Sequence, residues 1–213
     1  MKIVLAAAFI AAATPAVAGP FTVTNVQTDH DQIITLDSPL FSPMQSYVGR
    51  IDLTTSTGKT LHAWCIDLFH DVYVGGNQHL AYTTGPIVDD HHGAKLTIMQ
   101  RQEISGLIHR EDALFALGKA TSTDSAATQL AIWSIEYPTF TYSDASDATR
   151  AAANQLIAHA PRVTGGEGSL VALGGTQSFA SAVDAPASVA LLLGGLPLLW
   201  AARRLRPEDE AEV

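Results

Sequence analysis

The chain has 213 residues, with 12 Lys or Arg against 21 Asp or Glu, and its formal net charge at pH 7 is −9. This acidic balance argues against nucleic acid and anionic lipid as partners. Its single cysteine excludes a disulfide within the chain. Between two apolar ends lies about one domain's length of chain.

The first 18 residues have the pattern of a secretory signal peptide. Lys2 precedes an apolar run from Ile3 to Ala13, and Ala16-Val17-Ala18 supplies a small-x-small cleavage pattern. An N-terminal membrane anchor is the alternative, but the apolar run is short and ends at a good cleavage site. We therefore expect signal peptidase to remove residues 1–18 and the rest of the chain to be exported.

The first half of the exported chain contains short runs of β-branched and aromatic residues separated by turn residues, a pattern that predicts β-strands. The pair Thr57-Gly58 lies between two of these runs and is typical of a hairpin turn. Strands joined by such turns pair antiparallel. The predicted strands cover 21–26, 32–36, 46–54 and 59–74.

The second half of the domain is dominated by helical patterns. Apolar residues over 96–117 fall on one broad helical stripe, which could be split over two helices near 110–112. Helices over about 125–136 and 144–160 follow, each begun by capping Thr, Ser or Asp residues and stopped by a proline. Strands followed by helices predict an α+β domain over 19–162 with an antiparallel, β-rich N-terminal half.

The C-terminal part contains a second apolar segment. A Gly/Ser/Thr-rich stretch, 163–182, is predicted to be a last strand or a spacer leading to it. Residues 185–202 are 18 uncharged residues followed by Arg203, Arg204 and Arg206. As a helix they span about 27 Å, close to a bilayer core of about 30 Å, which predicts a transmembrane helix with a cytoplasmic C-terminus. A buried hairpin is the alternative, but it leaves the arginines unexplained.

The order of a short proline motif, an apolar helix and an arginine cluster resembles the PEP-type C-terminal sorting signal that exosortases recognise. Asp-Ala-Pro stands here where the family motif has Pro-Glu-Pro. The resemblance implies a sorting signal over 183–206 with an acidic tail over 207–213, an exosortase-like enzyme as partner, and a Gram-negative, exopolysaccharide-rich surface. It also implies a transient inner-membrane anchor followed by display at the cell surface or release. The matching motif residues are Asp184, Pro186, Ala187 and Ser188.

Two residues of the predicted domain point to chemistry. Cys65 is the only thiol and lies in Trp64-Cys65-Ile66-Asp67. A small buried apolar residue is the ordinary alternative role of a free cysteine. Gln129 lies on an apolar helical face, where burying an unpartnered amide costs about 1–3 kcal/mol, so its side chain needs partners.

These two stretches together resemble the TQxA thioester domain of bacterial surface adhesins. Trp64-Cys65-Ile66-Asp67 and Thr128-Gln129-Leu130-Ala131 carry the resemblance, which extends over about 48–137. It implies an internal thioester between Cys65 and Gln129. The thiolate would attack the side-chain carbonyl of the glutamine and expel ammonia.

The neighbours of the pair are candidates for supporting roles. Asp67 could orient a group or a water molecule, but its negative charge would not lower the pKa of the thiol. Trp64 and Trp133 could be walls that keep water from the thioester, or ordinary core residues. Thr128 could donate a hydrogen bond to the acyl oxygen, or bond back to its own helix.

The leading functional hypothesis is adhesion by an exported surface domain whose thioester captures an amine on a target surface or matrix molecule. The alternative is a non-covalent binding or structural protein of the extracellular matrix or exopolysaccharide, with the same fold and no thioester. A secreted hydrolase is disfavoured because no G-x-S-x-G motif is present. The eight histidines lack the spacing of metal ligands. We therefore expect no enzyme activity, metal or cofactor.

Overall fold

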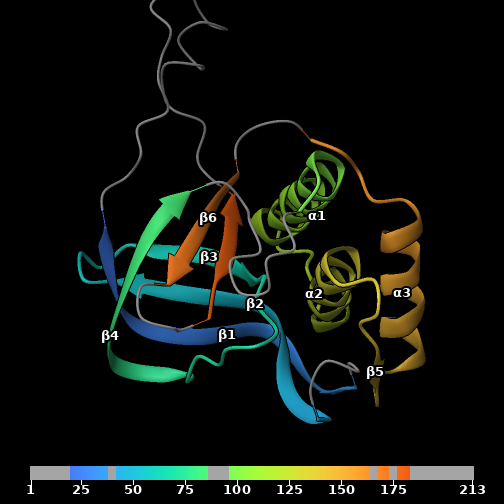
Figure 1. Ribbon diagram of the computed structural model, residues 1–213, viewed down its shortest axis with the longest axis horizontal. Coiled ribbons are helices and arrows are strands. Elements are labelled where there is room, and N and C mark those ends of the chain that lie inside the picture. Colours follow the sequence, from blue (N-terminus) through green and yellow to red (C-terminus); the bar gives the residue numbers. More distant parts are fainter. Residues whose placement is uncertain (1–19, 38–41, 86–95, 164–166, 173–176, 183–213) are drawn as a thin grey trace, which may run out of the picture. The chain divides into compact units, whose positions relative to one another are not determined.

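The computed structural model describes most of the predicted exported domain (Figure 1). The described residues belong to one compact unit, Val17–Val183. The predicted signal peptide, sorting signal and C-terminal helix lie outside them. No helix in the described part of the chain is long and apolar enough to cross a membrane. The described residues are 20–37, 42–85, 96–163, 167–172 and 177–182.

Antiparallel strands form a sheet that closes on itself. The order along the sheet is β2-β3-β7-β6-β4-β1-β5, and β1 also pairs with β2. The first six strands in this order therefore complete a closed ring, with β5 added at the end of β1. Closure removes most of the free strand edges that an open sheet would expose. The strands are β1 (Phe21–Leu36), β2 (Met44–Thr55), β3 (Thr60–Cys65), β4 (Gly75–Gly85), β5 (Tyr142–Ser143), β6 (Glu167–Ala172) and β7 (Phe179–Ala182).

The strand β1 is continuous where two separate strands were predicted. Its register with β2 shifts between Asp29 and Gln32, and His30 has a φ of 56°. This is a β-bulge, which lets polar residues interrupt the apolar pattern without ending the strand. Gly49 on β2 permits the close approach, since a Cβ there would lie 2.8 Å from the Cα of Asp31.

The predicted third strand, 46–54, is confirmed as part of β2, whereas the predicted fourth strand is revised. The hairpin at Thr57-Gly58 is present, with Gly58 at a φ of 81°, a left-handed conformation that glycine adopts easily. The predicted strand over 59–74 ends early, at Cys65, because the Asp67 carboxylate accepts the backbone N–H of Phe69 at 2.9 Å and turns the chain. The sequence analysis missed β4, whose first residues are glycine and polar residues.

Three helices pack beside the barrel (Figure 1): α1 (Ile98–Ala116), α2 (Ser122–Glu136) and α3 (Asp147–Ala158). The α1 helix is single, so the possible split near 110–112 does not occur. Thr121 and Asp124 form a capping box at the start of α2, which satisfies backbone N–H groups at that end. The α2 helix contacts β1, β2, α1 and α3. It is therefore the central helix of the layer.

The predicted order, strands followed by helices, is correct for the chain up to α2, and only the short β5 comes between α2 and α3. The α+β class with an antiparallel N-terminal half is confirmed. The helical second half is incomplete as a description, because β6 and β7 follow α3 and return to the sheet. They lie in the segment predicted as a strand or spacer. In particular, β7 lies between β3 and β6 in the sheet order.

Two apolar clusters form the core, and α2 contributes to both. Alternate residues of β3 enter different clusters, as the strand period predicts: Cys65 belongs to the first and Trp64 to the second. From α2, Trp133 enters the cluster of Cys65, while Ile132 enters that of Trp64. The end of β3 and the middle of α2 are therefore held together by apolar packing on two sides.

Candidate functional site

The thiol of Cys65 is buried at the end of β3. The residue is 2% exposed. Its Sγ donates to the backbone carbonyl of Asp67 at 3.0 Å and accepts the backbone N–H of the same residue at 3.4 Å. The side-chain amide nitrogen of Gln177 lies 2.7 Å from the sulfur. The sulfur therefore sits among polar groups, although it is sealed from solvent.

Gln129 lies on α2 with its amide against the backbone of the same cysteine. Its Oε1 accepts the N–H of Cys65 at 2.9 Å, and its Nε2 donates to the carbonyl of Cys65 at 2.8 Å. Gln129 is 1% exposed. These two bonds supply a donor and an acceptor for the buried amide, so its burial requires no covalent partner.

The amide of Gln129 takes the place of a strand. The paired register of β2 and β3 stops at Ile51 and Ala63. Continuing that register would place Gly49 opposite Cys65, but the pairing of β2 and β3 does not extend there. The side-chain amide has the same donor and acceptor as a peptide group. Gln129 therefore completes the hydrogen bonding of β3 where β2 leaves it.

Ser125 has a matching role one helical turn before Gln129, on the same face of α2. Its Oγ accepts the backbone N–H of Arg50 on β2 at 2.9 Å. Ser125 is fully buried. Side chains of α2 thus provide hydrogen-bond partners for backbone groups of both β2 and β3, at the point where these two strands separate. The sequence analysis did not single out Ser125, because serine near a helix start is expected as a cap.

The electrostatic environment keeps the sulfur protonated. Burial raises the pKa of the Cys65 thiol well above its ordinary value, and the carboxylates of Asp67 and Glu136 raise it further. The backbone of Asp67 and the Trp133 indole oppose this rise. The indole N–H meets no acceptor with hydrogen-bond geometry among the described residues, so its effect is that of a nearby dipole. At neutral pH the group is a thiol.

Of the four predicted supporting residues, two lie near the Cys65 sulfur or in its apolar cluster, and two do not. Asp67 is 1% exposed and borders the sulfur with its backbone, while its carboxylate binds the N–H of Phe69 and the Nδ1 of His70, at 2.9 and 3.0 Å. Thr128 donates instead to Glu111 on α1, at 3.3 Å. Trp133 shares the apolar cluster of Cys65, and Trp64 belongs to the other cluster.

Gln177 is a site residue that the sequence analysis missed. It immediately precedes Ser178 and β7, in the segment predicted as a strand or spacer. A single glutamine in a Gly/Ser/Thr-rich stretch carries no signal by itself. The only available hint was its position two residues before Phe179 in an apolar strand pattern. The predicted sorting residues, Asp184 to Ser188 and the three arginines, lie outside the described residues.

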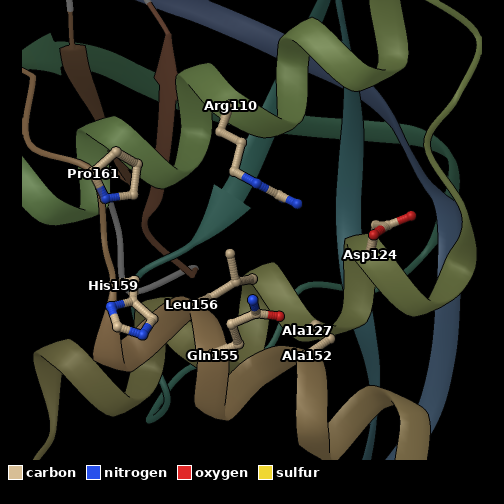
Figure 2. Close-up of a pocket in the computed structure, with 8 residues that line it drawn as sticks. All are labelled: Arg110, Asp124, Ala127, Ala152, Gln155, Leu156, His159 and Pro161. Atoms are coloured by element: carbon tan, nitrogen blue, oxygen red, sulfur yellow. The ribbon is translucent and has the colours of Figure 1, made fainter.

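A separate cavity of about 420 Å³ lies among the three helices (Figure 2). Arg110 from α1, Asp124 and Ala127 from α2, and Gln155 and Leu156 from α3 line it. None of the residues that contact the sulfur contributes to it. In the described part of the chain, no group of three or more His, Cys, Asp or Glu side chains is placed to hold a metal ion.

Comparison with known proteins gives structural neighbours and no sequence match. No protein-family model and no curated protein matches the chain. One solved structure similar to the chain is the N-terminal thioester domain of a surface protein from Clostridium perfringens, with 12% identity and a TM-score of 0.47; the match covers 76% of this chain and 98% of that one. Another is the N-terminal domain of the pilus tip adhesin Cpa from Streptococcus pyogenes, with 13% identity and a TM-score of 0.46, covering 78% and 94%.

Proposed function

We propose that Cys65 and Gln129 form an internal thioester, and that the domain is an exported adhesion module that captures amines on a target surface. One observation carries the proposal. The buried amide of Gln129 bonds both backbone polar groups of the chain's single cysteine, across a sequence separation of 64 residues. A helix and a strand thereby hold next to each other two buried residues, one carrying an acyl group and the other a thiol.

Thioester formation would proceed by attack of the Cys65 sulfur on the side-chain carbonyl carbon of Gln129. The backbone N–H of Cys65 already donates to Oε1, where negative charge develops in the tetrahedral intermediate. The carbon–nitrogen bond then breaks. The thiol proton is transferred to the departing nitrogen, which leaves as ammonia. Because the resting group is a thiol, proton transfer must accompany attack rather than precede it.

Amine capture would reverse the roles of the two residues. The amine nitrogen attacks the acyl carbon on Gln129, and the bond from carbon to sulfur breaks. The sulfur takes up the proton that the amine loses, which restores the thiol and leaves an amide on Gln129. Burial of both residues protects the thioester from hydrolysis before the target arrives.

The intact mass of the mature domain, 19–183, tests the proposal. The protein should weigh one ammonia less than its sequence and should lack a titratable thiol when denatured without a nucleophile. Methylamine should restore the thiol and leave a methylamide on Gln129. Cys65→Ala and Gln129→Ala should each abolish the mass deficit. Gln155→Ala should leave it intact, because this exposed α3 residue lines the separate cavity and does not contact the sulfur. Full sequence mass with a freely titrating thiol would instead favour the non-covalent matrix protein.

The proposal includes an export route. Signal peptidase would remove 1–18, and an exosortase-like enzyme would process the sorting signal and release the domain to the cell surface. Replacing Arg203, Arg204 and Arg206 by Ser should then leave uncleaved precursor in cell fractions. Sorting that is unchanged in this variant would contradict the route without affecting the thioester.

A further inference from the structure

We propose that the cavity of about 420 Å³ among the three helices, the interhelical cavity, is a second binding site and takes one neutral, hydroxyl-rich sugar unit of a glycan (Figure 2). None of its lining residues contacts the Cys65 sulfur, so ligand binding there does not depend on the thioester. The observation that carries the proposal is a set of polar side chains, from all three helices, whose hydrogen-bonding groups face this space unused.

The face of α3 toward the interhelical cavity carries polar residues among apolar ones. Four residues line the cavity at the i, i+3, i+4, i+7 spacing of one helical face: Ala152, Gln155, Leu156 and His159. The alanine and the leucine also pack against the apolar cluster of Cys65. The side chains of Gln155 and His159 make no hydrogen bond to the described residues. This face therefore offers donors and acceptors that the protein itself does not use.

Arg110 points into the interhelical cavity from α1 (Figure 2). Its Nη1 donates to the carboxylate of Glu111 at 3.1 Å, and Glu111 is fully buried. A guanidinium carries five N–H donors, and no other hydrogen bond or ion pair joins Arg110 to the described residues. The buried carboxylate thus holds the guanidinium in place, while the other N–H groups remain available to a ligand.

Asp124 supplies an acceptor from α2. Its Oδ2 accepts the backbone N–H and the hydroxyl of Thr121, at 3.2 and 2.6 Å, in the capping box of this helix. The other carboxylate oxygen, Oδ1, has no hydrogen-bond partner among the described residues, and no ion pair joins Asp124 to Arg110 there. The cavity therefore presents separate donors and acceptors instead of a closed salt bridge.

The charges around the interhelical cavity favour a neutral ligand. Arg110 already lies against one carboxylate, and Asp124 is a second one nearby: burial raises the pKa of Glu111, and the charge of Asp124 raises it further. An anionic ligand would meet these carboxylates with one guanidinium as compensation, whereas an ammonium group would lie beside that guanidinium. Both arrangements cost free energy in a partly buried site. A neutral ligand avoids both costs.

A sugar unit matches this lining in chemistry and in shape. Each hydroxyl both donates and accepts, so it can bond to Arg110, Gln155 or Asp124. One sugar ring carries several hydroxyls around a compact body, whereas a peptide unit offers one donor and one acceptor. Aliphatic side chains, among them Ala127 and Leu156, form much of the remaining lining and can contact the C–H face of the ring. Arg110 and Gln155 are exposed, so further units of a glycan can extend into solvent.

The test titrates the isotope-labelled full chain with the methyl glycosides of glucose, galactose, mannose and N-acetylglucosamine, followed by backbone amide NMR shifts. These probes carry no amine, so a thioester cannot capture them, and failure of the proposed function would leave this test unchanged. At least one probe should bind with a Kd of about 1 mM and shift amides of all three helices around the cavity. The Kd should not change between about 0.05 and 0.5 M salt, because the ligand is neutral.

Two variants of α3 locate the site. Ala152→Leu fills the cavity while keeping its polar groups, and it should weaken binding at least about tenfold; Ala151→Leu, the same change at an exposed position that does not line the cavity, should stay within about twofold. Gln155→Leu should weaken binding by about 3- to 10-fold through lost hydrogen bonds, and Asn154→Leu, also exposed and outside the lining, is its control. The thermal midpoint of each variant shows that it is folded.

Three results would overturn the proposal. One is the absence of amide shifts around the cavity with every glycoside at about 20 mM. Another is wild-type affinity in folded Ala152→Leu and Gln155→Leu. The third is tighter binding of glucuronate, glucose 6-phosphate or lysine than of every neutral glycoside, which would make the cavity a site for charged ligands.

Discussion

Removing the amide of Gln129 should destabilise the domain even when no thioester can form. The perturbation is Gln129→Met in a Cys65→Ala background, which keeps the backbone bonds at position 65 but excludes covalent chemistry. Methionine matches the length and apolar stem of glutamine. It cannot bond the backbone N–H and carbonyl of residue 65, which the amide holds at 2.9 and 2.8 Å.

The magnitude follows from two buried groups left without partners. Each costs about 1–3 kcal/mol, so the loss is about 2–6 kcal/mol against a typical total of about 5–15 kcal/mol. With a urea dependence of about 2 kcal/mol per M, the unfolding midpoint should fall by about 1–3 M at unchanged slope.

The assay is urea unfolding followed by circular dichroism. Gln155→Met in the same background is the control, and this exposed site should change the free energy of unfolding by no more than about 0.5 kcal/mol. A loss below about 0.5 kcal/mol for Gln129→Met would refute the view that this side chain replaces a strand.

Three further predictions concern packing, pH and chain length. Gly106→Ala on α1 should lower the free energy of unfolding by at least about 1–3 kcal/mol in a thermal melt, since its Cβ would lie 2.0 Å from the carbonyl oxygen of Pro161. Wild-type stability in this variant would mean that the backbone at Pro161 moves away at no cost in free energy. Burial raises the pKa of Glu111, so its contribution to stability is present below the ordinary value of 4.5 and is lost as pH rises through the folded value. Glu111→Gln should therefore flatten the fall in unfolding free energy above pH 4.5, and an unchanged pH profile would exclude this carboxyl as its source. Chain 19–183 should elute as a folded monomer, whereas 19–163 should aggregate on size exclusion, because it lacks β6 and β7 and leaves one edge of β3 and one edge of β4 without a partner. A folded monomer from the shorter chain would contradict the closed barrel.

The sequence predicted best the features that local chemistry determines. The turn at Thr57-Gly58 requires a residue that tolerates positive φ, and the start of α2 requires capping groups such as Thr121 and Asp124. Both the turn and the helix start depend on residues that are close together in the sequence. The placement of Cys65 and Gln129 on a strand and a helix could be predicted for the same reason.

The sequence did not predict features that depend on distant partners. The polar residues around His30 resemble a loop in the sequence, but the pairing of β1 with β2 on both sides of them makes this segment a β-bulge. The start of β4 is Gly75-Gly76, which has little strand propensity and is held by its pairing with β1. Gln177 and Ser125 gain their roles only from backbone groups far away in the sequence.

The position of β7 sets the order in which the site can be assembled. This strand is the last described element of the chain, yet it pairs with β3 beside Cys65 and brings Gln177 to the sulfur. A chain that crosses a membrane from its N-terminus delivers the thiol first, the acyl group of Gln129 next and this amide last. Until residue 177 has arrived, the barrel has a gap next to the cysteine. The completed site can therefore exist only after nearly the whole domain has reached the same compartment.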